Sequence, residues 1–416
     1  MKYIKYILVL LAFVYWLVPI YLRALPGWLN SGIYNGFPLV YLLWNYKHFR
    51  TLLKEIKLSY LWISVAFLVG AIIWSFVAIA YNNTYDYSYF LKIFTVVRSV
   101  YIGIFLLILS DKTLHPQNML EKYSVFYGGA IAVCVAFTIF TLLFLDLRES
   151  YILLLNQTDR PALLEDEMYI TRFSVGGFAG FSQTILASFG GILSYYLINR
   201  KRYIGFPLMM MSFLGNLFYG RIGIILSLIA IVILMIKTVK FNTVILQFFG
   251  VFCSLIVFYV VIGMFDNPMF DAWKMWLMQP VESFIQGVQY GQITFGSSGD
   301  RLVYGMYFIP DDSTILWGDG RYENPDGSYY MHTDAGYMRI TLYFGIIGAL
   351  MIYASYLSLT IFALQNLRND KVGRYIVMAL LICFFIAEYK GDAYPTFFGI
   401  VSVIGLCGKK GRLPCQ

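Results

Sequence analysis

Apolar runs long enough to cross a lipid bilayer recur along almost the whole chain, and they limit the possible folds more than any other feature. A spanning helix needs about 20 mostly apolar residues. Hydrophobic residues make up 59% of the chain and charged residues only 13%, whereas an average soluble domain is about 25% charged. The sequence therefore predicts an all-α polytopic membrane protein with about 12 transmembrane helices. The runs lie near residues 3–22, 30–45, 60–80, 90–110, 124–145, 177–199, 203–219, 222–236, 243–264, 337–364, 375–388 and 393–408.

Lysine and arginine indicate which side of the membrane each loop faces, because they collect on cytoplasmic segments. With the N-terminus placed inside, most of the 31 cations fall on inner segments, as at Lys2, Lys5 and residues 200–202. Few of the 23 carboxylates do so. Both termini are therefore expected in the cytoplasm, and the net charge of +8 reflects topology rather than nucleic-acid binding. The first apolar run lacks a small-residue cleavage site, which favours a retained helix over a signal peptide.

Two polar inserts interrupt the apolar pattern on the outer side of what we expect to be a single transmembrane domain, residues 1–416. The first covers residues 146–175 and the second covers 265–336. The second holds ten carboxylates, three cations and a histidine. Long connections of this kind are usually functional, so we expect a large outer loop that carries short helices and the chemistry. None of the five cysteines lies in an outer loop, so we expect neither a disulfide scaffold nor a zinc site. The carboxylates at 311–312 and 165–167 could bind a divalent metal, but such runs are more often solvated, and we expect no metal.

Four arginines are placed at the outer rim of the predicted domain. Arg172 begins the helix after the first insert, and Arg221 lies in the tight turn Tyr219-Gly220-Arg221-Ile222-Gly223. Arg301 lies in the second insert, and Arg339 begins the helix that follows it. A guanidinium group presents a planar fork of donors that matches phosphate oxygens. We therefore predict that these arginines bind a lipid-linked pyrophosphate. The alternative is that each pairs with a carboxylate or reaches the lipid headgroups.

His332 stands just before a predicted membrane helix. An unperturbed imidazole titrates near pH ~6.5, so it can take a proton from an attacking hydroxyl group. Asp334 could orient it, and the alternative is an ordinary polar loop histidine. Trp317, Asp319 and Arg321 suit sugar binding, because aromatic faces stack on pyranose rings and carboxylates accept hydroxyl hydrogens. Together with Asp334 they form the expected glycan-binding set.

A third group of charges lies close to the apolar runs. Glu388, Lys390 and Asp392 cluster at an outer turn, and Lys92 lies near the outer end of its helix. Ionisable residues are costly in a membrane and tend to be functional. Glu388, Lys390 and Asp392 can also neutralise one another, and we favour a structural network. Lys92 can extend to the headgroup layer.

Four stretches of the chain match the motifs of a known family. Arg172-Phe173-Ser174 with Gly176-Gly177-Phe178 opens a helix, and Tyr219-Gly220-Arg221-Ile222-Gly223 forms a small-Arg-small-Gly turn. The long outer insert falls late in the chain. His332-Thr333-Asp334-Ala335-Gly336 then precedes a helix that contains Gly345-Ile346-Ile347-Gly348. With these features the chain resembles the O-antigen polymerase and O-antigen ligase superfamily of bacterial inner membranes.

The resemblance implies a GT-C-like membrane fold and an inverting, metal-independent glycosyl transfer at the periplasmic face, without a cofactor. The donor would be a glycan on undecaprenyl pyrophosphate. Arg172, Arg221, Arg301 and Arg339 would stabilise the charge of the leaving pyrophosphate. His332 would deprotonate the acceptor hydroxyl and act with Arg221 as the catalytic pair. A chain-length regulator protein is a further possible partner.

Several functions stay open at this point. A polymerase, which we favour, moves the glycan onto the next lipid-linked repeat unit, whereas a ligase moves it onto lipid A-core. A flippase for lipid-linked oligosaccharide also fits the helix count, but it should place charges along a central cavity and needs no long outer insert. A structural membrane protein would tolerate the loss of Arg221 and His332.

Overall fold

The computed structural model describes most of the chain. The described residues are 2–54, 56–113, 118–156, 172–238, 268–290 and 297–408. The predicted span near 243–264 lies outside them.

Seven helices in the described part of the chain are long and apolar enough to cross a membrane. This confirms the predicted all-α, multi-pass class, while the count of about 12 spans stays a prediction. The seven are α5 (Ser59–Asn82), α6 (Ser88–Asp111), α7 (Met119–Leu143), α11 (Phe181–Asn199), α13 (Arg221–Thr238), α18 (Gly336–Asn366) and α19 (Lys371–Lys390).

Several predicted runs form shorter helices, for reasons that can be seen in the sequence. α1 (Lys2–Leu17) ends before Pro19, because the residue that precedes a proline disfavours helical geometry. The run near 30–45 is divided between α2 (Gly27–Ser31), the π-helical η1 (Gly32–Gly36) and α3 (Phe37–Trp44), where glycines weaken the helix. The other short helices are α4 (Tyr46–Lys54), α8 (Leu145–Leu154), α12 (Gly205–Tyr219) and α20 (Tyr394–Leu406).

Both inserts contain regular elements. In the first, β1 (Phe173–Ser174) pairs antiparallel with β2 (Gly177–Phe178). The second contains α15 (Pro268–Tyr290), α16 (Ser297–Asp300), the π-helical η2 (Arg301–Gly305), α17 (Asp312–Trp317) and the 3-10 helix η3 (Tyr330–His332).

The chain divides into two compact units, and the divisions fall within α4, α6 and α15. Unit 1 consists of residues 1–49 and 104–278. Its core is formed by α7, α11, α12 and α13, with α1 packed on α7. Small residues let these helices approach closely: a Cβ atom on Gly190 would lie 2.7 Å from the Ser212 hydroxyl oxygen.

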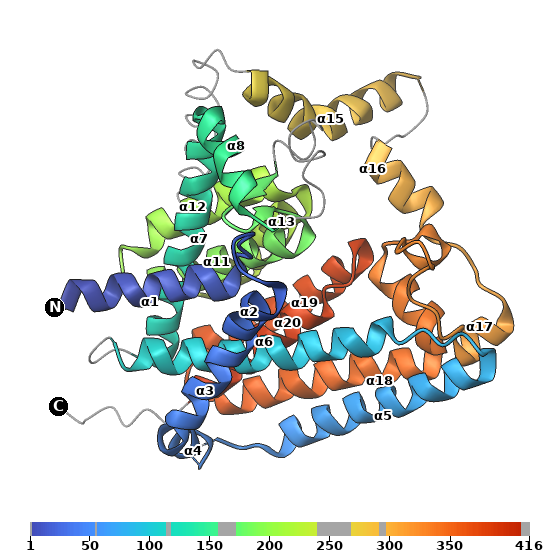
Figure 1. The fold of residues 1–416 in the computed structure, drawn as a ribbon, viewed down its shortest axis with the longest axis horizontal. Helices are drawn as coiled ribbons and strands as arrows, with labels where there is room; N and C mark the ends of the chain where they lie inside the picture. The colour runs from blue at the N-terminus through green and yellow to red at the C-terminus, as the bar shows by residue number, and fades with distance from the viewer. Residues whose placement is uncertain are drawn as a thin grey trace. The chain divides into compact units, whose positions relative to one another are not determined.

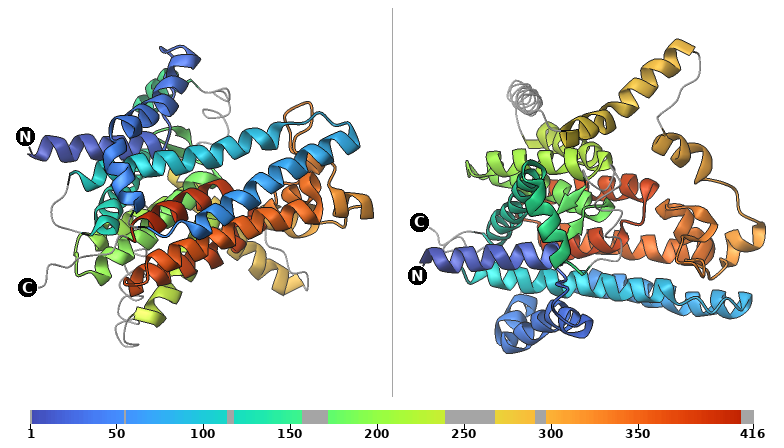
Figure 2. Two further views of the ribbon diagram at one scale, coloured as in Figure 1. Left: turned by 90° about the horizontal axis from the view of Figure 1, so that it is seen from below. Right: turned by 45° about the horizontal axis from the view of Figure 1, so that its top comes forward.

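Unit 2 consists of residues 50–103 and 279–416. Here α5 lies alongside α18, as Figures 1 and 2 both show, and α20 packs against α18. The Ser64 hydroxyl donates to the Ser355 carbonyl oxygen across the α5–α18 contact, at 2.7 Å. One residue of α18 is not helical: Gly345 has φ 63° and ψ −177°.

Candidate functional site

Two stretches that the sequence singled out meet in unit 1. The buried Tyr219 hydroxyl, at the end of α12, lies 3.4 Å from the Ser174 hydroxyl in the β1–β2 hairpin. It also lies 3.0 Å from the Thr138 hydroxyl, which donates to the Phe173 carbonyl oxygen at 2.7 Å. The hairpin and the 219–223 turn are therefore fixed to each other through α7.

The glycines of the 219–223 turn are needed for close packing. A Cβ atom on Gly220 would lie 2.6 Å from the Thr184 hydroxyl oxygen, near the start of α11. A Cβ atom on Gly223 would collide with Asn216 and Thr184. The small-Arg-small pattern thus lets the turn press against α11 and sets the position of Arg221 between the two glycines.

Arg172 and Arg221 converge on one indole ring. Their guanidinium carbons lie 4.8 and 4.5 Å from the ring centroid of Trp276, within the range of a cation–π interaction. Arg221 also donates a hydrogen bond to the Trp276 carbonyl oxygen. The structure therefore brings together two of the four arginines that the sequence predicted to act on one ligand.

The first part of α15 is attached to the end of α12, and this attachment positions Trp276. The Trp273 indole nitrogen donates to the Leu217 carbonyl oxygen at 3.0 Å, and its ring lies 5.3 Å from Phe218. Residues three apart share a helix face, so Trp276 lies on the same side of α15 as Trp273. The sequence could not show this contact, because α12 and α15 are far apart along the chain.

A third arginine, Arg148, was missed by the sequence reasoning. It lies in α8, is 2% exposed, and its guanidinium carbon is 4.8 Å from the Phe173 ring centroid. Burial lowers the pKa of Arg148 to about 10. The residue therefore supports the hairpin that carries Arg172. Its sequence position gave no signal beyond its place near the start of the first insert.

In unit 2, Arg339 lies between two tyrosine rings. It is 4% exposed, and its guanidinium carbon lies 3.7 and 3.6 Å from the centroids of Tyr322 and Tyr329. Its Nε and Nη2 atoms are buried and have no hydrogen-bond partner among the described residues. Arg339 therefore holds the loop that leads to His332 against the first turns of α18.

The charges at the outer turn have partners outside the turn rather than in one another. Lys92 contacts Asp392 at 2.9 Å, and the Tyr322 hydroxyl donates to the same carboxylate at 2.6 Å. Burial alone would raise the pKa of Asp392, but Lys92 and the Tyr322 hydroxyl hold it below its usual range. The fully buried Glu388 accepts from the Ala393 backbone amide at 2.8 Å.

His332 is exposed at the end of η3. Its φ of 54° and that of Met331, 52°, lie in the left-handed region, which is uncommon for residues other than glycine. Asp334 contacts Lys390 at 3.8 Å, and no hydrogen bond between Asp334 and His332 occurs among the described contacts. Arg301 is exposed in η2. Arg301, Arg339 and His332 belong to unit 2, so their convergence with the unit 1 arginines stays a prediction.

The residues expected to bind glycan have partners within the protein. Trp317 stacks on Trp74 with ring centroids 5.3 Å apart. Asp319 accepts from the Thr314 hydroxyl at 2.6 Å and from the Tyr330 hydroxyl at 3.2 Å. Arg321 lies over the same tyrosine, with 5.6 Å between its guanidinium carbon and the ring centroid. Their role in glycan binding stays a prediction.

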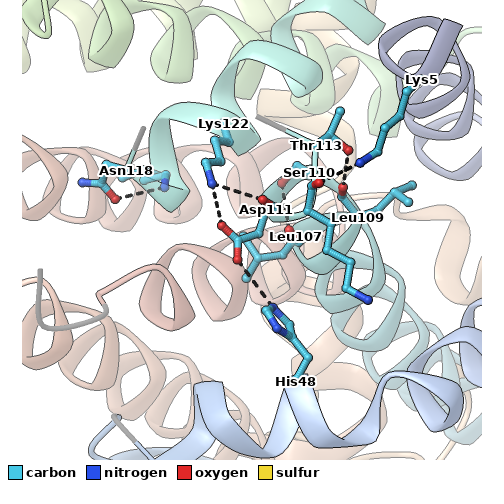
Figure 3. A network of polar contacts seen from close by, with 11 residues as sticks. Lys5, His48, Leu107, Leu109, Ser110, Asp111, Thr113, Asn118 and Lys122 are labelled. Atoms are coloured by element: carbon cyan, nitrogen blue, oxygen red, sulfur yellow. Dashed lines mark hydrogen bonds and ion pairs between the residues drawn. The ribbon is translucent and has the colours of Figure 1, made fainter. Parts of the chain in front are cut away.

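A polar cluster lies at the other end of α7 in unit 1 (Figure 3). The Asp111 carboxylate contacts Lys122 at 2.8 Å and His48 at 3.5 Å. Lys5 donates to the Lys112 carbonyl oxygen at 2.8 Å. α7 has 25 residues and is about 36 Å long at 1.5 Å per residue. The lysine-rich cluster at the start of α7 and the arginines near its end are therefore separated by the length of one membrane span.

Asp86 connects the α5–α6 loop to the second insert. One carboxylate oxygen accepts from the backbone amides of Tyr322, at 2.5 Å, and Glu323, at 3.1 Å. The other oxygen accepts from the Ser88 amide at 2.8 Å. Burial raises the pKa of Asp86, but the hydrogen bonds from the Ser88 hydroxyl and from these backbone amides outweigh it and hold the pKa below its usual value.

We expect Asp86→Ala to destabilise unit 2 by about 1–3 kcal/mol, because the backbone amides of Ser88, Tyr322 and Glu323 lose their acceptor. Since the folded-state pKa is lowered, this stabilisation is present above the unfolded pKa of about 4 and is lost as the pH falls through the folded value. Thermal melting of purified protein across acidic pH measures the effect. Asp311→Ala, at an exposed residue whose side chain makes no cap hydrogen bond, is the control and should melt like the wild type.

Among the described residues, no group of three histidine, cysteine or carboxylate side chains could hold a metal ion. No protein-family model, curated protein or solved structure gives a significant match to the chain.

Proposed function

We propose that this protein is a bacterial polysaccharide polymerase of the O-antigen or capsule type. It would transfer a glycan from undecaprenyl pyrophosphate to a lipid-linked repeat unit. The observation that carries the proposal is the pair of guanidinium groups, Arg172 and Arg221, that both contact the Trp276 ring. Two stretches that resemble family motifs supply these arginines, and the hairpin and turn that hold them are fixed to each other.

The pair suits a diphosphate leaving group. As the bond between the sugar and the pyrophosphate breaks, negative charge develops on the phosphate oxygens, and preorganised guanidinium donors stabilise that charge. Their positions are set by backbone packing at Gly220 and by the hairpin. The donors therefore need little rearrangement during the reaction.

The transfer would be a single displacement. The acceptor hydroxyl oxygen forms a bond to the anomeric carbon, and the bond from that carbon to the pyrophosphate breaks with inversion. His332 takes the hydroxyl proton, and the pyrophosphate leaves with the bonding electron pair. The exposed position of His332 suits an acceptor that arrives from outside the protein. No metal ion or cofactor takes part in this scheme.

The orientation follows from the two ends of unit 1. The lysine-rich cluster around Asp111 lies at the start of α7, and the arginine pair lies near its end. Because cations collect on the cytoplasmic side, the cluster would be cytoplasmic and the arginine pair periplasmic. Both termini would then lie in the cytoplasm, in a GT-C-type fold of the inner membrane.

The experiment that tests the proposal uses purified protein in detergent with a lipid-linked repeat unit. A polymerase produces a ladder of longer lipid-linked glycans, which gel electrophoresis resolves. A flippase produces none, because detergent removes the second compartment. In cells, deletion of the gene should leave single repeats on lipid A-core. A ligase deletion would instead leave no repeats there and would accumulate lipid-linked polymer.

A further inference from the structure

The interruption of α18 at Gly345 leaves backbone carbonyl groups without their helical partners. Gly345 has φ 63° and ψ −177°, so the amides beyond it cannot continue the regular pattern of helix hydrogen bonds. In hydrocarbon, every backbone polar group needs a partner within the protein. The break lies inside a predicted membrane span, so the carbonyl groups before Gly345 need hydrogen-bond donors from other parts of the protein.

Two backbone amides that follow α17 and one side chain of α5 donate hydrogen bonds to these carbonyl oxygens. The Asp319 amide donates to the Leu342 carbonyl oxygen at 2.6 Å, and the Gly320 amide donates to Tyr343 at 3.2 Å. The Trp74 indole nitrogen, from α5, donates to the Phe344 carbonyl oxygen at 2.7 Å. Three consecutive carbonyls of a spanning helix are thus paired by a loop and by a neighbouring helix.

Two glycines allow this contact. A Cβ atom on Gly318 would lie 2.5 Å from the Tyr343 carbonyl oxygen, and one on Gly345 would lie 2.7 Å from the Gly318 amide nitrogen. Both glycines have positive φ, 78° and 63°, which other residues rarely adopt. The backbone of the insert and the backbone of α18 therefore touch directly.

The contacts place α17 beside the last two turns of α5. Trp317 stacks on Trp74, at 5.3 Å, and on Tyr81, at 6.1 Å. A Cβ atom on Gly320 would lie 2.8 Å from the Ile79 amide nitrogen. Trp74 is eight residues before Asn82, the end of α5, or about 12 Å along the helix. Along the axis of α5, α17 therefore lies on the membrane side of the helix end at Asn82 and not on its aqueous side.

The exposed side chains of α17 next to α5 are apolar, like the exposed side chains of α5 itself. Leu316 is 45% exposed and Trp317 is 36% exposed, although both lie in a polar insert. On α5, Ile73 and Tyr81 are also exposed. Exposed apolar residues on a spanning helix face the acyl chains, so the surface that continues from them is in the same environment. Asp311 and Asp312, which are exposed at the start of α17, suit the aqueous boundary.

We propose that residues 312–320 form a re-entrant turn in the outer leaflet, and that Leu316 and Trp317 contact lipid acyl chains, which for Trp317 replaces the role in glycan binding expected from the sequence. The turn enters from the aqueous side at Asp312, closes the break in α18, and returns toward Asp86 through Tyr322. The proposal concerns the lipid as a partner of this segment and does not depend on the glycosyl transfer proposed above.

Spin labels on single cysteines test the proposal in the full-length protein, reconstituted into phosphatidylcholine liposomes after replacement of its five native cysteines. Each label is assayed for collision with oxygen, which concentrates in the bilayer, and with a water-soluble nickel chelate. For Leu316→Cys we expect oxygen collisions to dominate, as for Leu350→Cys on the exposed face of α18. For Asp326→Cys, in an exposed turn, we expect the nickel chelate to dominate.

Ser313→Cys provides a matched control on the same short helix, where the side chain is exposed next to Asp312. Its label should be more accessible to the nickel chelate than that of Leu316→Cys, since the two positions differ in depth. Variants are accepted only if their size-exclusion profile matches that of the cysteine-free parent. If the Leu316 label collides with the nickel chelate as often as the Asp326 label does, α17 lies in water and the proposal is wrong.

Discussion

Replacing Arg221 by alanine should abolish detectable polymer and lower the rate of chain elongation by at least about a hundredfold, the usual effect of removing one donor that stabilises a charged transition state. Arg221 both contacts the Trp276 ring and donates to its backbone carbonyl. Its position is set by glycines that pack against Thr184. The measurement is the elongation rate of purified protein with a lipid-linked repeat, together with glycan banding from cells that carry the variant.

Two further variants separate loss of function from loss of folding. Arg221→Lys keeps the positive charge but loses the planar fork of donors, so we expect it to retain partial activity. Arg202→Ala removes a half-exposed arginine that pairs with Glu121 at the lysine-rich end of unit 1, at 3.3 Å. It should elongate like the wild type. Wild-type chain lengths in Arg221→Ala would exclude the arginine pair as the pyrophosphate site.

Much of the architecture could be predicted because the bilayer imposes it. Runs of about 20 apolar residues have few alternatives to a spanning helix, and α5, α6 and α7 follow the predicted runs closely. Where glycine or proline interrupts an apolar run, as near 30–45, the helices in the structure are shorter than the prediction from the sequence. The interruption of α18 was not predicted. Gly345 is one of two glycines in a Gly-Ile-Ile-Gly stretch, and only Gly345 takes a non-helical conformation.

The site was predicted only in part, because composition identifies residues but not their partners. Arg172 and Arg221 were chosen for their place at the outer rim, and the structure brings them together. Trp276, which both contact, was not among the predicted site residues. Trp317 was assigned to sugar stacking, and in the structure its ring stacks on Trp74. Such contacts join residues that are distant along the chain, by 55 positions for Arg221 and Trp276, and no local pattern encodes them.

Replacing His332 by alanine should lower the elongation rate at least about a hundredfold with little change in donor binding, as for the loss of a general base. Free imidazole added to His332→Ala should restore part of the rate, because it can enter the space left by the side chain. His332→Gln keeps a polar side chain of similar size but cannot take the proton, so it should be as slow as the alanine variant. Elongation assays at saturating donor measure all three effects.

Asp326 provides the contrast that separates a base from a structural residue in the same loop. Asp326 lies in an exposed turn and accepts from the Ser328 amide at 2.9 Å. Asp326→Asn should therefore change the rate less than about tenfold, as expected for the loss of one exposed hydrogen bond. Imidazole should not affect this variant. A wild-type rate in His332→Gln would show that the proton leaves by another route. In that case the left-handed backbone at Met331 and His332 would serve only to shape the loop that Arg339 holds.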